Sequence, residues 1–241
     1  MVSGNIVLAA GGGVSVGEHW TGSIFGMSVN LDTIVATLIA GAIVIGLGLY
    51  VARGASVGRP TKVQLAFETT KDAIEDQVEQ SLGIRTAPWV VPFAFAIALM
   101  ILFCNLLAIL PTEEVLPPPT ADTNLTFALS LVVMLCVWFT AIKRNPGHFF
   151  GEFKNPLAII EEIVKPLSLA LRLFGNVLSG VIMIQVIVLL PIYVFWVPFT
   201  IWKLFDIFIG VLQAVIFTVL TIVYFGQAVV NEDVKAAEGA H

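Results

Sequence analysis

Five long stretches of this chain carry no charged side chain, and they constrain its fold more than any other feature. They span residues 33–52, 86–112, 123–142, 173–202 and 207–231. A helix needs about 20 apolar residues to cross the hydrocarbon core of a bilayer, so each stretch supplies one membrane span. Charged residues make up only 12% of the 241 residues, about half of the usual share in soluble domains. We therefore predict an all-α membrane protein with about five transmembrane helices.

The basic residues set the expected orientation. Lys and Arg are absent before Arg53, cluster between the first and second spans, are absent from 111–122 and return at Lys143. Because basic loops stay on the inner side of the membrane, the N-terminus is expected outside and the C-terminus in the cytoplasm.

The chain is expected to form a single membrane domain. Its segments, in order, are an outside N-terminal segment (1–30), a first transmembrane helix (31–52), a cytoplasmic amphipathic helix (60–83), a second transmembrane helix (88–110), an outside loop (111–123), a third transmembrane helix (124–142), two long helices (156–190 and 199–231) and a cytoplasmic tail (232–241). The apolar face of the amphipathic helix is formed by Val63, Phe67, Ile74, Val78 and Leu82. These residues recur at helical spacing. The two long helices are expected to form a hairpin that turns around Pro191 to Pro198.

A polar stripe runs along the first long helix. Its members, each three or four residues from the next, are Glu161, Lys165, Ser168, Arg172, Asn176 and Ser179. That spacing places them on one helical face, which must meet protein or water rather than lipid. Arg172 keeps its charge at any useful pH and costs about 2.5–3.5 kcal/mol at the bilayer centre. The spans offer only Asp206 as an acid, so we expect its partner carboxylate on another subunit.

The second long helix carries Asp206 and Gln213 on one face. A hairpin centred near residue 193 places Gln213 opposite Arg172, and Asp206 opposite residues 179–181, about 10 Å nearer the outer surface. A fixed cation between an outer acid and an inner polar line is the layout expected for ion translocation. The inner line consists of Glu161, Glu162, Lys165 and Ser168.

Two simpler interpretations stay open for these charges. The inner carboxylates and Lys165 can reach the interface by snorkelling, with no further role. Asp206 can serve only to neutralise Lys203, three residues before it.

Several blocks of the sequence resemble one known family. The block KPLSLALRLFGN (165–176) resembles the signature of subunit a of the F-type ATP synthase. Supporting blocks are NLLAILP (105–111), PTADTN (119–124), LQAVIF (212–217) and LTIVY (220–224). Their order and spacing agree with that family, and the resemblance covers roughly residues 105–231.

The resemblance implies a stator subunit of a bacterial plasma membrane, beside a rotating ring of c subunits and with peripheral-stalk b subunits as further partners. The last two helices are then strongly tilted against the ring. By this resemblance, Arg172 is expected to separate an outer from an inner half-channel that both lead to a ring carboxylate, with Asn176 and Gln213 near it. Because the chain lacks a Walker-type loop, we expect no nucleotide chemistry in this subunit.

The chain departs from the family pattern at one point. Many bacterial members carry a Glu five residues after the Asn and a His seven before the Gln, where this chain has Val181 and Asp206. We therefore expect Asp206 alone to be the titrating group of the outer half-channel.

Other classes of function have less support. The net charge of −5 gives no basic face for nucleic acid. The chain has no HExxH pair, no Walker-type loop and no GxSxG element, so we expect no catalytic residues, metal or cofactor. The alternative is a stand-alone secondary ion transporter, which would need an internal inverted repeat that the sequence lacks.

Overall fold

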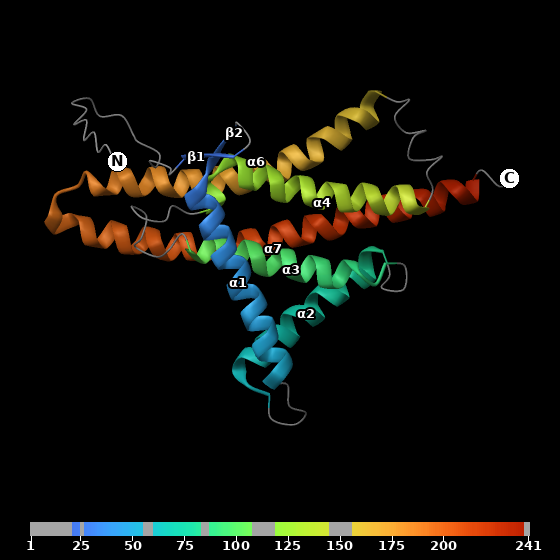
Figure 1. Cartoon of the computed structure of the whole chain (residues 1–241), viewed down its shortest axis with the longest axis horizontal. Coiled ribbons are helices and arrows are strands. Elements are labelled where there is room, and N and C mark those ends of the chain that lie inside the picture. The colour runs from blue at the N-terminus through green and yellow to red at the C-terminus, as the bar shows by residue number, and fades with distance from the viewer. Residues whose placement is uncertain are drawn as a thin grey trace.

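The computed structural model describes residues 21–24, 27–54, 60–82, 87–107, 119–144 and 156–238. A short β-hairpin, β1 (Thr21–Ile24) and β2 (Met27–Asn30), pairs antiparallel with Thr21 opposite Asn30. The remaining elements are helical: α1 (Leu31–Gly54), α2 (Lys62–Ser81), α3 (Val90–Leu107), the 3₁₀ turn η1 (Pro119–Ala121), α4 (Thr123–Arg144), α6 (Pro156–Val188) and α7 (Ile192–Glu238) (Figure 1).

Five of the described helices, α1, α3, α4, α6 and α7, are long and apolar enough to cross a membrane. This confirms the predicted all-α membrane class, to which the structure adds the β-hairpin. Parts of the expected organisation lie outside the described residues, among them the first 20 residues, residues 108–118 and the last three residues.

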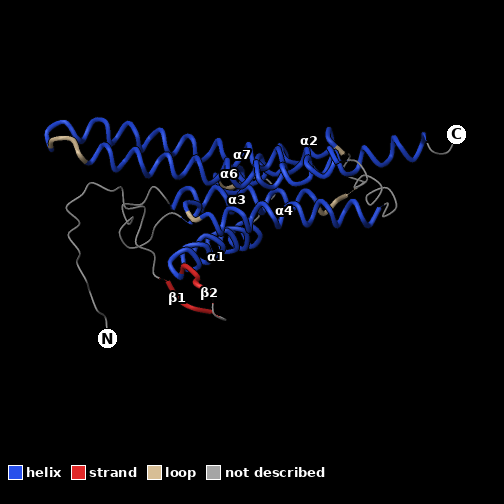
Figure 2. Tube along the Cα trace, turned by 90° about the horizontal axis from the view of Figure 1, so that it is seen from above, coloured by secondary structure: helices blue, strands red, loops and turns tan. Residues whose placement is uncertain are grey.

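The hairpin of α6 and α7 is the longest feature of the molecule. Its closed end projects past α3 and α4, and the end of α7 lies at the opposite end (Figures 1 and 2). The 33 residues of α6 extend ~50 Å, and the 37-residue apolar part of α7 extends ~55 Å. Since the hydrocarbon core is only about 30 Å thick, the apolar part of α7 is much longer than a perpendicular crossing needs.

The turn of this hairpin is tighter than the sequence predicted. Only residues 189–191 separate the two helices, so α7 begins at Ile192 instead of 199 and contains Pro198. The carbonyl of Pro191 accepts hydrogen bonds from the backbone N–H groups of Val194 and Phe195 and so starts the helix. Pro198 removes one later backbone hydrogen bond, a loss that membrane helices tolerate. At its other end α7 continues through the predicted tail to Glu238.

Helix α2 follows the amphipathic pattern in its second half. The Thr61 hydroxyl caps it by accepting a hydrogen bond from the Gln64 N–H at 3.2 Å. Ile74, Val78 and Leu82 are buried as predicted, whereas Val63 is 40% exposed. On the polar face, a hydrogen bond from Lys71 to Glu75 raises the pKa of Lys71.

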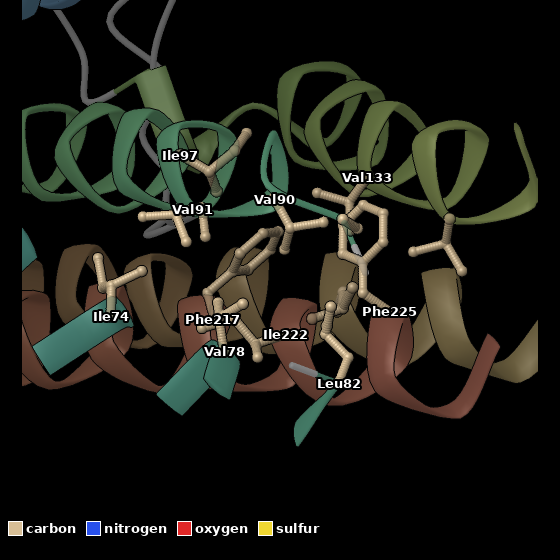
Figure 3. Packing of buried hydrophobic residues seen from close by; sticks show 14 of the residues in the cluster. Ile74, Val78, Leu82, Val90, Val91, Ile97, Val133, Phe217, Ile222 and Phe225 are labelled. Carbon is tan, nitrogen blue, oxygen red and sulfur yellow. The ribbon is translucent and has the colours of Figure 1, made fainter. Parts of the chain in front are cut away.

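The hydrophobic core lies where α2, α3, α4, α6 and α7 meet (Figure 3). Phe217 and Phe225 of α7 are fully buried. The ring of Phe225 packs edge-to-face against Trp89, with 5.2 Å between ring centroids, a favoured arrangement for aromatic pairs. Leu169 and Leu173 of α6 are also fully buried members of this core, which therefore joins α6 to α4 and α7.

Hydrogen bonds join the start of α1 to the start of α4. The Asp122 carboxylate accepts hydrogen bonds from the Asn30 amide at 2.8 Å, the Thr33 hydroxyl at 2.9 Å and the Asn124 N–H at 2.8 Å. Asp122 and Thr33 are both buried. These bonds, with the contacts of η1 to α1, α3, α4 and α6, place the start of α1, the end of α3 and the start of α4 at the same end of the bundle.

Candidate functional site

The central part of the polar stripe on α6 lies on the surface of the chain. Arg172 is exposed, and Ser168 and Asn176 are half-buried. Within the described part of the chain, the Arg172 guanidinium makes no hydrogen bond or ion pair. A permanent charge without an internal partner agrees with the expectation that its counter-charge lies outside this chain.

Asp206 of α7 lies directly opposite Gly180 of α6. A Cβ atom at Gly180 would come within 2.8 Å of the Asp206 Oδ1. This confirms the predicted position of Asp206 opposite residues 179–181. The contact also sets the register of the hairpin, because α6 and α7 run antiparallel with the same rise per residue.

A small polar cavity lies one helical turn further along the hairpin from the contact between Gly180 and Asp206. Its volume is about 20 Å³, and it is lined by Asn105, Asn176, Val177, Asp206 and Gly210. That volume holds about one water molecule, and the carboxylate and two amides supply hydrogen-bond partners for it. Extending the register by one more turn brings Arg172 and Gln213 to within one residue of the same level.

Gln213 is the buried amide of this group. Its side chain is only 5% exposed, and its Nε2 has no hydrogen-bond partner among the described residues. A buried donor without a partner costs free energy, about 1–3 kcal/mol. The amide is thus a donor available to an acceptor that this part of the chain does not supply.

Asn105 connects the cavity to the end of the bundle where η1 lies. Its Nδ2 donates to the Gly210 carbonyl at 3.1 Å, and its Oδ1 accepts from the Thr120 hydroxyl at 3.1 Å. The sequence alone favours a helix-packing or cap role for Asn105 and does not indicate a role in the site. The sequence signal that could have pointed to the site is that Asn105 is the only amide side chain in the uncharged stretch 86–112.

The inner residues of the stripe form a separate cluster. The Lys165 ammonium lies 2.5 Å from Glu162 Oε1 and 3.6 Å from Glu161 Oε1. Trp138 of α4 donates its indole N–H to Glu162 Oε2 at 2.6 Å. The structure thus brings Glu161, Glu162 and Lys165 together and adds Trp138, which no sequence pattern had indicated.

These features define the class of protein. It is a multi-pass membrane protein in which charged and amide side chains follow one long helical hairpin, with Arg172 on its surface.

Comparison with known proteins identifies the family of this chain. Residues 34–226 match the family described as the ATP synthase A chain. The chain is 45% identical over 224 residues to ATP synthase subunit a of Acidothermus cellulolyticus, covering 89% of this chain and 83% of that one. It is 42% identical to ATP synthase subunit a of Mycobacterium leprae, covering 94% and 97% of the two chains. It therefore belongs to the ATP synthase subunit a family, the proton-translocating subunits of F-type ATP synthases, and acts within a complex of several subunits.

Proposed function

We propose that the chain provides two offset aqueous half-channels to a carboxylate on a ring of c subunits, with Arg172 as the barrier between them. Proton flow through the two paths drives rotation of the ring and thereby ATP synthesis. The observation that carries this proposal is the exposed Arg172, which has no ion-pair partner in the described part of its own chain.

The chemistry of the guanidinium suits such a barrier. A cation beside a ring carboxylate favours its ionised form and lowers its pKa, which promotes proton release on the inner side. The guanidinium itself cannot give up its proton at physiological pH, so it cannot carry protons directly between the two paths.

The remaining site residues divide between the two half-channels. Asp206 is the titrating group of the outer one, and the cavity between Asp206 and Asn176 supports a water molecule on its route. Gln213, with its unpartnered amide donor, comes to the level of Arg172 in the register of the hairpin, which supports a role for it at the meeting point of the two paths. The inner half-channel follows Ser168, Lys165, Glu161 and Glu162.

The proposal includes the surroundings of the chain. The basic residues favour a bacterial plasma membrane orientation with the N-terminus outside and the C-terminus in the cytoplasm. Peripheral-stalk b subunits are the further expected partners. A stand-alone secondary transporter would function without a ring, so copurification of c subunits with this chain separates the two interpretations.

The test is proton transport by the whole enzyme in proteoliposomes with Arg172→Ala. We expect loss of ATP-driven pumping in complexes that still contain the c ring, with a passive proton leak. Arg144→Ala removes the same side chain at the exposed end of α4 and serves as the matched control. Normal pumping by assembled Arg172→Ala complexes would reject the barrier role.

A further inference from the structure

Glu161 and Glu162 are neighbours in sequence, yet they differ sharply in their surroundings. The Glu162 side chain is 20% exposed and that of Glu161 is 67% exposed. Both oxygens of Glu162 are engaged, one by the Trp138 indole N–H and the other by the Lys165 ammonium. Among the described residues, Glu161 forms an ion pair with Lys165 alone, at the longer distance of 3.6 Å.

The two carboxylates also point in different directions from α6. On a regular helix, Glu161 lies about 20° from the direction of Arg172, whereas Glu162 lies about 80° away from it. Glu161 therefore continues the surface stripe that contains Arg172 and Ser168. Glu162 turns toward α4, where Trp138 holds it.

From this contrast, and resting on the proposed function, we propose that Glu161 is the carboxylate that exchanges protons between the inner half-channel and inner water. Trp138 is a positioning residue that acts through Glu162. The indole N–H fixes the Glu162 carboxylate, and this carboxylate fixes Lys165 beside Glu161. A proton arriving by water from the Ser168 region binds the Glu161 carboxylate and leaves to the inner water, which restores the carboxylate.

The cluster has the chemistry that this division needs. Both oxygens of Glu162 accept hydrogen bonds, from the Trp138 indole and the Lys165 ammonium, which hold this carboxylate in place. The Lys165 ammonium lies 3.6 Å from Glu161 Oε1 and leaves most of the Glu161 side chain open to water. The other charged side chains that α4 brings to this end of the bundle are Lys143 and Arg144, in its last turn.

The experiment compares two matched substitutions in the whole enzyme, reconstituted in proteoliposomes. ATP-driven pumping is measured per assembled complex at a series of pH values on the inner face. We expect Glu161→Gln to slow pumping by about tenfold or more, in line with the effect of losing a positioned proton carrier. Glu161→Gln is expected to abolish the dependence of the pumping rate on the pH at the inner face. Glu161→Asp is expected to restore this dependence.

Trp138→Phe and Glu162→Gln test the positioning role. Each is expected to lower the pumping rate while leaving the shape of the pH profile unchanged. The double variant should be no slower than either single variant, because both changes disrupt one connection. If Trp138→Phe complexes do not assemble, Glu162→Gln decides alone, since it keeps an acceptor for the indole and breaks the same chain of contacts at the ion pair with Lys165.

The opposite pattern would overturn the inference. If Glu162→Gln loses the pH dependence and Glu161→Gln keeps it, the roles are reversed. If Arg172→Ala blocks pumping but Glu161→Gln pumps with the wild-type rate and pH profile, this inference fails while the proposed function stands. If Arg172→Ala pumps normally, the proposed function itself fails.

Discussion

At the scale of single residues, the contact between Gly180 and Asp206 decides where the outer carboxylate can lie. The two helices approach so closely there that the Asp206 carboxylate occupies the space of a side chain on α6. In the family pattern, an acid on the first long helix accompanies a His on the second. In this chain the position after Gly180 is Val181, and the carboxylate reaches across from α7.

Gly180→Ala tests this contact. The added Cβ would lie 2.8 Å from Asp206 Oδ1, so the carboxylate must move away from the cavity. We expect slower ATP-driven pumping by complexes that assemble normally. Gly46→Ala is the control, because a Cβ at Gly46 has no heavy atom within 4 Å. This substitution changes only the helix propensity, which favours Ala over Gly by about 1 kcal/mol. Equal pumping by both variants would contradict the positioning of Asp206 by Gly180.

Asp206→Asn tests whether this carboxylate titrates. The amide has nearly the same shape but cannot carry a proton between waters, so we expect pumping and passive flux through the ring to fall strongly. Asp206→Glu should retain part of the flux, because it keeps an ionisable group. Proton flux in everted membrane vesicles is the measurement, and an unchanged flux in Asp206→Asn would remove Asp206 from the proton path.

At the scale of elements, α7 is held by α2 and α3 on one side and by α6 on the other. A Cβ at Gly226 would lie 3.0 Å from the Ser81 carbonyl oxygen, where the last turn of α2 meets α7. Since that oxygen belongs to the backbone, it cannot rotate away as a side chain would. The close approach lets α2 cover the core under Phe225.

We therefore expect Gly226→Ala to separate the end of α2 from α7 and to lower the free energy of unfolding by about 1–3 kcal/mol, the usual cost of overpacking. Denaturation of the purified chain in mixed micelles provides the measurement. Gly54→Ala adds the same methyl group where no atom lies within 4 Å. A Gly226→Ala variant as stable as Gly54→Ala would mean that α2 and α7 are not in such close contact.

At the scale of the whole molecule, the start of α1, the end of α3 and the start of α4 meet at one end of the bundle. The starts of α1 and α4 are joined by hydrogen bonds to Asp122, and the end of α3 is joined to η1 by the bond between Thr120 and Asn105. Five spans that alternate in direction fit this arrangement. The distribution of Lys and Arg indicates which side is the cytoplasmic one.

Labelling with a membrane-impermeant maleimide tests this orientation. Thr69 of α2 and Asn124 of α4 are both exposed. We expect Thr69→Cys to react from the cytoplasmic side, in inverted vesicles. We expect Asn124→Cys to react from the outer side, in right-side-out vesicles. The native Cys104 is buried and Cys136 is half-buried, so the unsubstituted chain sets the background. The reverse pattern would exchange the inner and outer half-channels.

The sequence by itself determined the class of the protein, its five apolar helices and the polar stripe around Arg172. These depend on composition and on the 3.6-residue period, which are local properties of each segment. The contacts of Gly180 with Asp206, Asn105 with Gly210 and Trp138 with Glu162 join different helices, at separations of 26, 105 and 24 residues. Only the tertiary structure decided them, because they depend on how closely the helices approach, on their relative register and on how tightly the hairpin turns.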